Sequence, residues 1–97
     1  MTREQLLRKA KIRVRKSSTD MLDDDVSQLI DVALTDLKRI GVHQTYLDEL
    51  EDPLVIEAVL NYVKANYSIN SDYERLIECY NMTLTKIKGG NYRQPKE

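Results

Sequence analysis

Few residues of this chain could do chemistry, and none has the partners that catalysis requires. His43 is the only histidine and Cys79 the only cysteine among 97 residues. A catalytic nucleophile needs a base beside it, and a zinc site needs several ligands, so one imidazole and one thiol far from it in sequence provide neither. We interpret His43 as an ordinary surface residue in a polar loop and Cys79 as an inert, half-buried thiol. The sequence therefore predicts a protein that is not an enzyme.

Three consecutive aspartates, Asp23, Asp24 and Asp25, form the one candidate for a divalent-cation site. Consecutive residues at a helix start point in different directions, and the glycine and distal glutamate of a calcium loop are missing. One of the three is expected to cap the helix that follows, and the other two to lie at its positive dipole end. We therefore predict no metal site.

Apolar residues recur at helical spacing in four segments, which predicts an all-α fold, a small bundle of about four helices. Thr2 and Gln5 have the form of a capping box and begin a helix over about residues 3–14. The clearest helix spans residues 26–40, and Gly41 is its expected left-handed C-cap. No segment alternates with period two, so no sheet is expected.

Two more helices are predicted in the second half of the chain. The third covers residues 53–67, because Asp52 is a suitable cap and a proline is favoured at the first helical position. Ser71 and Glu74 form a second capping box, and the last helix ends at the glycines 89–90. The expected core consists of apolar residues that share the inner faces of these helices. They are Leu29, Ile30, Leu34, Leu37, Val59, Leu60, Val63, Leu76, Ile77 and Tyr80.

Residues 1–90 are predicted to form a single helical domain, and residues 91–97 a flexible, polar tail. The connection over residues 42–51 is long for a loop between helices, and loops of this length are often functional. A lone cysteine suits a reducing compartment. The basic N-terminus lacks the apolar centre of a signal peptide, and no apolar run reaches membrane-spanning length, so we expect no membrane partner.

Charge is unevenly distributed along the chain, although the formal net charge is only −1. Seven cations precede Ser17, whereas residues 20–36 carry six aspartates and no cation, and a second acidic block lies at 48–52. Such a distribution favours contact between copies as readily as contact with nucleic acid. The basic segment lacks helix-turn-helix spacing and interleaved aromatics, so we favour a solvated or protein-facing surface over DNA binding.

Landmark residues occur along residues 6–87 in an order that resembles one known family. The landmarks are Lys11 to Arg15, Asp23 to Val26, Leu29 to Asp31, Asp36-Leu37, Gly41-Val42, Asp52 to Leu54, Asn61 to Tyr67, Glu74 to Leu76, and Tyr80. Together they resemble the head–tail connector (adaptor) proteins of long-tailed phages, also described as phage DNA-packaging proteins. In that family a glycine usually follows the aromatic that ends the third helix, whereas this chain has Ser68.

The resemblance implies a structural subunit without a cofactor, in a roughly dodecameric ring of copies of itself. The ring would dock on the portal protein after DNA packaging and offer a platform to a stopper or tail-completion protein. DNA would pass through it without sequence-specific binding. The subunit would be made in the bacterial host cytoplasm, or be encoded by a prophage, and end at the head–tail interface of the virion.

The candidate contacts with neighbouring subunits or the portal combine the basic N-terminal segment with the second acidic block. They are Arg8, Lys11, Arg13, Arg15, Lys16, Tyr46, Asp48, Glu49, Glu51 and Asp52. The alternative function is a small phage or prophage DNA-binding regulator that uses the basic N-terminal helix.

Overall fold

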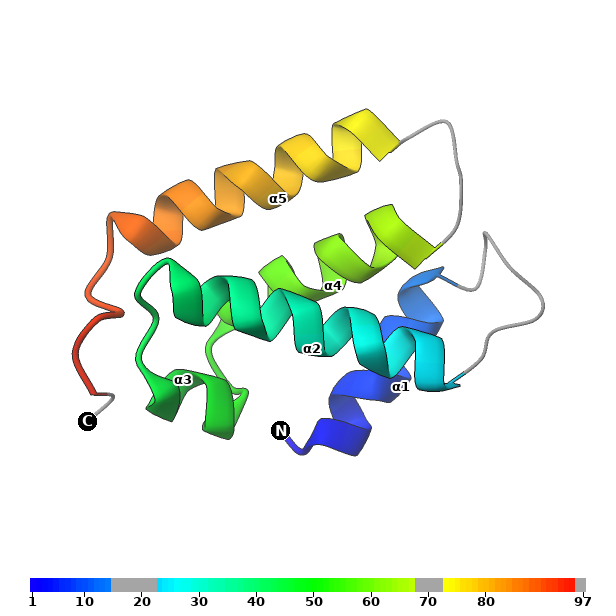
Figure 1. Ribbon diagram of the computed structural model, residues 1–97, viewed down its shortest axis with the longest axis horizontal. Helices are drawn as coiled ribbons and strands as arrows, with labels where there is room; N and C mark the ends of the chain where they lie inside the picture. The colour runs from blue at the N-terminus through cyan, green and yellow to red at the C-terminus, as the bar shows by residue number, and fades with distance from the viewer. Residues whose placement is uncertain (15–22, 68–72, 96–97) are drawn as a thin grey trace.

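The computed structural model describes residues 1–14, 23–67 and 73–95, and these ranges hold five helices and no strand (Figure 1). The prediction of an all-α fold is confirmed. The helices are α1 (Arg3–Val14), α2 (Asp23–Arg39), α3 (Gln44–Glu49), α4 (Pro53–Tyr67) and α5 (Tyr73–Lys88). The bounds of α1 and α4 agree with the predicted ranges, while Ser71, the predicted cap of the last helix, lies outside the described residues.

Helix α4 is the centre of the bundle, because α1, α2 and α5 all pack against it. Its buried residues point in several directions, as expected for a helix with neighbours on several sides. They are Val55, Ala58, Val59, Leu60, Asn61, Val63 and Ala65. In Figure 1, α2 and α5 run in the same direction and α4 runs against them, while α1 lies on the other side of α2 from α5. The molecule measures 40 × 27 × 18 Å.

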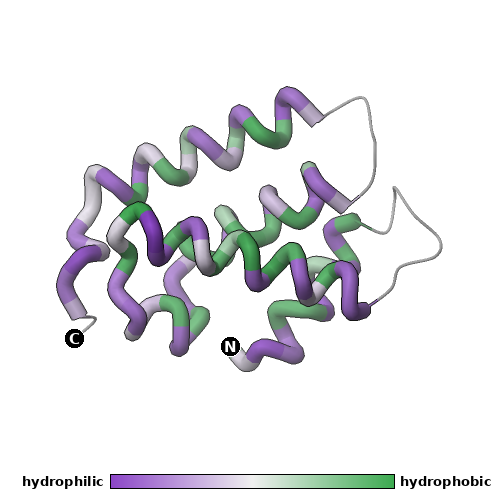
Figure 2. Tube along the Cα trace, in the orientation of Figure 1, coloured by the Kyte–Doolittle hydropathy of each residue, from purple (hydrophilic) through white to green (hydrophobic). Residues whose placement is uncertain are grey.

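The apolar residues form one core cluster, and most of the predicted core belongs to it. Along α2 and α5, hydrophobic stretches are separated by hydrophilic ones about once per helical turn (Figure 2). The inner face of α2 is centred on Val26, Ile30, Ala33 and Leu37, all buried. Leu29 and Leu34 lie at the two edges of that face and are only half-buried, and Ile77 is half-buried on α5. The other seven predicted core residues are buried.

The predicted capping box at the start of α1 has the expected geometry. The Thr2 N–H donates to Gln5 Oε1 over 2.8 Å, and the Gln5 N–H donates back to Thr2 Oγ1 over 3.1 Å, which completes the capping box. Residues 23–25 all lie in the first turn of α2, at the positive end of its dipole. The prediction that one of these aspartates precedes the helix as its cap is therefore wrong, because all three belong to the helix. The position before α2 lies outside the described residues.

Gly41 ends α2 in the left-handed region, with φ of 108°, as predicted. Its N–H donates to the Lys38 carbonyl over 3.1 Å, and the Val42 N–H donates to the Leu37 carbonyl over 3.0 Å. This pair of hydrogen bonds is a Schellman motif. Because Val42 and Leu37 are both in the core cluster, the motif also directs the chain back into the protein.

The predicted long loop over residues 42–51 is wrong, because most of it is helix α3. His43 is not a surface loop residue without a role but the N-cap of α3, where its Nδ1 accepts from the Thr45 N–H over 3.2 Å. Leu50 ends the helix at φ of 52°, and it is buried together with Leu47. A helix of six residues has fewer than two turns, so it leaves no apolar periodicity in the sequence.

The folded part also extends beyond the predicted boundary at residue 90. The Tyr92 ring lies 4.8 Å from the Tyr46 ring, centroid to centroid. Its hydroxyl donates to Asp52 Oδ1 over 2.8 Å, and its carbonyl accepts from the His43 N–H over 2.7 Å. One aromatic residue in a polar stretch therefore attaches residues 91–93 to the start of α3 and α4, while residues 96–97 lie outside the described range.

Candidate functional site

Helix α1 carries the basic segment, and its two sides have different environments. Leu6, Ala10 and Val14 are fully or almost fully buried against the bundle. Arg8 and Lys9 lie on the opposite, exposed side. Arg15 and Lys16 fall outside the described residues, so the described part of the predicted basic surface ends at Val14.

Two of the predicted interface cations form ion pairs within the chain. Lys11 Nζ lies 2.6 Å from Asp23 Oδ1 on α2, and Arg13 Nη1 lies 3.2 Å from Glu57 Oε1 on α4. Arg13 Nη1 also lies 3.5 Å from Oδ1 of the buried Asn61. These cations therefore hold α1 against its neighbours, a role the sequence analysis did not assign to them.

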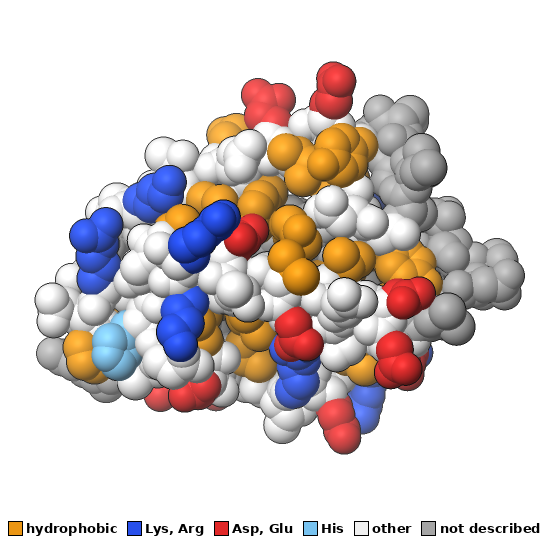
Figure 3. Space-filling view, in the orientation of Figure 1, with side chains coloured by type: hydrophobic (Ala, Val, Ile, Leu, Met, Phe, Trp, Pro, Cys, Tyr) orange, Lys and Arg blue, Asp and Glu red, His pale blue; other side chains and the backbone are white. Residues whose placement is uncertain are grey.

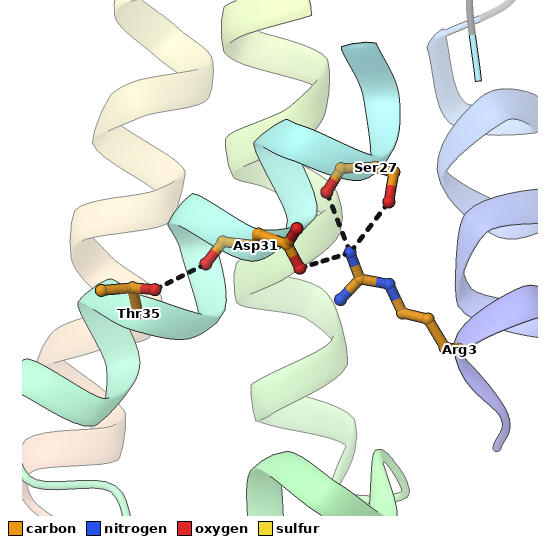
Figure 4. Close-up of polar contacts among 4 residues, drawn as sticks. All are labelled: Arg3, Ser27, Asp31 and Thr35. Carbon is orange, nitrogen blue, oxygen red and sulfur yellow. Dashed lines mark hydrogen bonds and ion pairs between the residues drawn. The ribbon is translucent and has the colours of Figure 1, made fainter. Parts of the chain in front are cut away.

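Arg3 provides a further link between α1 and α2 that sequence reasoning missed. Its Nη2 donates to the Ser27 carbonyl over 2.9 Å, to Ser27 Oγ over 3.2 Å and to Asp31 Oδ1 over 2.7 Å (Figure 4). Ser27 and Asp31 lie one turn apart, so the sequence indicates that they share one face of a helix. It does not show that Arg3 is the residue that binds both. With Lys11–Asp23, this contact fixes which flank of α2 faces α1.

The predicted acidic block separates into exposed and structural members. Asp48 is exposed and accepts from Gln44 Nε2 over 2.9 Å, and Glu49 is exposed at the end of α3. Glu51 is exposed with a carboxylate oxygen 3.5 Å from the Met1 amino group. Tyr46 is half-buried against Tyr92, as described above.

Asp52 is the capping residue of α4, as its position before Pro53 predicted. Its Oδ1 accepts from the Leu54 N–H over 2.9 Å and from the Val55 N–H over 3.2 Å. The same oxygen accepts from the Tyr92 hydroxyl. The Asp52 carboxylate is thus engaged within the chain.

Asp36, Tyr62 and Tyr80 form a polar and aromatic contact between α2, α4 and α5. The Tyr80 hydroxyl lies 3.3 Å from Asp36 Oδ2, and the Tyr62 and Tyr80 rings lie 5.2 Å apart. Burial and the nearby Asp36 carboxylate raise the pKa of both phenols above the ordinary value. Both phenols therefore hold their protons to higher pH than ordinary tyrosines, and Tyr80 donates to Asp36. The sequence gives no signal for a contact between residues 44 positions apart.

The described residues contain no group of histidine, cysteine, aspartate and glutamate side chains that could hold a metal ion. Cys79 is exposed on α5, so its predicted half-burial is wrong. The buried face of α5 is centred on Leu76, Tyr80 and Thr83, and Cys79 lies to the side of it. No helix in the described ranges has both the length and the apolar character needed to cross a bilayer.

Comparisons of the chain with models of protein families, with curated proteins and with solved structures found no match. What the chain does is therefore inferred from its own residues and their geometry.

Proposed function

We propose that this chain is a structural subunit of a bacteriophage head–tail connector ring, which docks on the portal after DNA packaging and links head to tail. The observation that carries the proposal is the outer face of α1. There Arg8 and Lys9 lie beside Ile12, whose side chain is 63% exposed although the other apolar residues of the helix are buried or half-buried. A surface with cations around an apolar residue is complementary to a surface on another protein that is apolar with acids at its edge.

The landmark residues behind the family resemblance support the proposal by their structural positions. Gly41 ends α2, and Asp52 with Pro53 begins α4. Residues 61–67 form the second half of the central helix. These landmarks thus coincide with the ends of helices and with the central helix, which set the course of the backbone and the packing of the bundle.

A ring is built from heterologous contacts, in which one patch of a subunit meets a different patch of its neighbour. The chain offers exposed cations on α1 and exposed acids at Asp48, Glu49 and Glu51. Exposed pairs of opposite charge each contribute roughly 0–1 kcal/mol, but repeated around a ring they favour one registry and one mode of encounter.

The alternative, a DNA-binding regulator, draws on the exposed Arg8 and Lys9, which could meet phosphates. Lys11 and Arg13 are engaged with acids of the same subunit, which leaves fewer cations for DNA. We therefore expect duplex DNA binding to be weak, indifferent to sequence and lost at physiological salt.

The deciding experiment is electron microscopy of the purified protein, alone and mixed with the portal protein encoded in the same genome. Ring-shaped particles seated on the portal would support the proposed function, even if the protein alone is monomeric. Failure to bind the portal would contradict it. Sub-micromolar binding to one duplex at physiological salt, with a scrambled duplex rejected, would favour the regulator instead.

A further inference from the structure

An apolar surface lies between α2 and α5, over the central helix α4 on which both helices pack. Both helices pack on α4 but touch each other little, so side chains at their facing edges remain accessible. Val32 is 38% exposed and Tyr73 45% exposed, although both are large and apolar. In Figure 3, hydrophobic side chains gather between α5 and α2. We call this surface the α2–α5 face, formed by Leu29, Val32, Tyr62, Tyr73 and Ile77.

Acidic residues lie at one end of the α2–α5 face. Asp25 is exposed, one turn before Leu29 and two turns before Val32, so the three share one stripe of α2. Glu74 is exposed in the first turn of α5, next to Tyr73. Because α2 and α5 run in the same direction, their acidic first turns lie at the same end of the molecule (Figure 1).

The outer face of α1 has the complementary character. Arg8 and Ile12 are one turn apart on its exposed side, and Lys9 is exposed beside them. Ile12 has the largest exposed fraction of the large apolar residues described. The α2–α5 face is apolar with an acidic end. The outer face of α1 carries Arg8, Lys9 and the apolar Ile12, with the exposed Glu4 one turn before Arg8.

We propose that the outer face of α1 in one copy of this chain docks on the α2–α5 face of a second copy. Ile12 lies against Val32 and Ile77 in this contact, and the two cations lie near the acidic end. The inference rests on the proposed function, because it names the surfaces through which the subunits of the ring join.

The positions of the two faces in the fold make this contact heterologous. Arg3 and Lys11 of α1 bind one flank of α2, through Asp31 and Asp23, and Tyr80 of α5 binds the other flank through Asp36. The two faces therefore lie on opposite sides of α2, and a copy cannot join its own. Each copy keeps one free face of each kind, which produces a ring if the rotation closes.

The contact between two isolated copies is expected to be weak. Each face is only about two helical turns long, which fits the smaller class of interfaces, below roughly 1,200 Å² of total buried area. Attraction between its exposed charges also falls with added salt. Cross-linking suits such a contact, because it captures transient pairs that a sizing column would miss.

The test uses two cysteine variants in a Cys79→Ser background. One copy carries Ile12→Cys and the other Val32→Cys, and disulfide cross-linking of the mixture is measured under mild oxidation. The matched control pairs Ile12→Cys with Thr85→Cys, an exposed position away from the α2–α5 face. We expect the 12–32 pair to exceed the 12–85 pair by about tenfold at low salt, the ratio that a preference of 1.4 kcal/mol produces.

Charge reversal tests the registry of the same contact. Arg8→Glu with Lys9→Glu in the Ile12→Cys copy should reduce the 12–32 cross-link by about tenfold, because two exposed attractions become repulsions. Asp25→Lys with Glu74→Lys in the other copy should restore it. A matched control, Lys86→Glu with Lys88→Glu, makes the same change of net charge at the far end of α5 and should leave the cross-link unchanged. Circular dichroism checks that each exposed variant keeps its helix content.

The outcomes separate this contact from the proposed function. The proposed contact is overturned if the 12–32 pair cross-links no better than the control, both in the free protein and in portal-bound particles. Rings on the portal would then leave the proposed function standing on another interface. Strong 12–32 cross-linking in a protein that never binds the portal would support the contact and contradict the proposed function.

Discussion

Asp52 connects three parts of the chain through one carboxylate oxygen. Oδ1 accepts from two N–H groups in the first turn of α4 and from the Tyr92 hydroxyl. The position before Pro53 identified the cap in the sequence, since the cap and its helix are adjacent. The bond to Tyr92 was not predictable, because it joins residues 40 positions apart and depends on the fold.

Stability should fall at alkaline pH as Tyr92 and Tyr80 ionise. Burial, together with the hydrogen bond to Asp52 and its charge, raises the pKa of Tyr92 to about 12, against about 10 in an unfolded chain. The folded state therefore holds this proton more tightly, so its contribution is fully present below pH of about 10 and is lost as pH rises towards about 12. The pKa of Tyr80 is also raised, by its burial and by the nearby Asp36 carboxylate.

The measurement is the free energy of unfolding in urea at several pH values from neutral to about 11, for the parent chain and for Tyr92→Phe. Titration of the lysines is common to both proteins, so the difference between the two curves isolates Tyr92. The variant should be less stable at neutral pH and should lose less stability with rising pH. Parallel curves for the two proteins would show that Tyr92 ionises alike in the folded and unfolded states.

At the scale of the elements, long amphipathic helices were predictable and short ones were not. Helix α2 has a wide apolar stripe, acids in its first turn and Gly41 after its end, so three independent signals agree. Helix α3 has one buried residue, Leu47, and a histidine cap, and histidine is not among the usual N-cap residues. Its existence depends on the core that Leu47 and Leu50 join.

The His43 cap should stabilise α3. His43→Ala removes the acceptor for the Thr45 N–H and should cost about 0.5–2 kcal/mol, whereas His43→Asp supplies another acceptor and should cost less. The backbone N–H of residue 43 still bonds to Tyr92 in both variants. Urea unfolding gives the difference, and amide exchange at Leu47 should report faster local opening in the alanine variant only. Equal stability of the two variants would exclude a capping role for the imidazole.

Gly41 should not tolerate a side chain, because of its backbone conformation and because of its close neighbour Arg93. Its φ of 108° disfavours any L residue, and an added Cβ would meet Arg93 Nε at 3.1 Å. Gly41→Ala should therefore cost about 1–3 kcal/mol in unfolding experiments. Gly89→Ala is the matched control, since a Cβ there meets nothing closer than 3.7 Å.

A second substitution separates the two causes at Gly41. If backbone strain dominates, adding Arg93→Ala to Gly41→Ala will not restore stability. Full recovery in the double variant would instead show that the contact with the Arg93 side chain is responsible, and that the end of α2 accepts the strained backbone.

At the scale of the molecule, one core cluster joins all five described helices. Residues of α1, α2, α3, α4 and α5 all contribute to it, and α4 contacts three of the other helices. The class of fold followed from the sequence, because the apolar periodicity is present in each long helix. The order of neighbours around α4 did not, since periodicity shows which face is buried but not against what.

Substitutions at the centre and at the edge of the inner face of α2 should differ in their effect on stability. Leu37 is fully buried at the centre of the inner face, whereas Leu34 is half-buried at its edge. Leu37→Ala should therefore cost about 2–5 kcal/mol, because it leaves a cavity that the surrounding helices cannot close. Leu34→Ala should cost clearly less, because water can reach the vacated space and less apolar area returns to solvent.

Both variants should unfold in one cooperative step, because the helices share their apolar contacts and none keeps a core of its own. Circular dichroism reports all helices together, whereas the NMR signals of the backbone amides of α5 report that helix by itself. The two transitions should coincide in urea for the parent and for each variant. If Leu34→Ala and Leu37→Ala reduced the free energy of unfolding equally, the two side chains would be equally buried. Helix α2 would then be rotated about its axis relative to α4. Separate transitions would mean that α5 folds and unfolds as an independent layer, and the α2–α5 face would then exist only when both helices are in place.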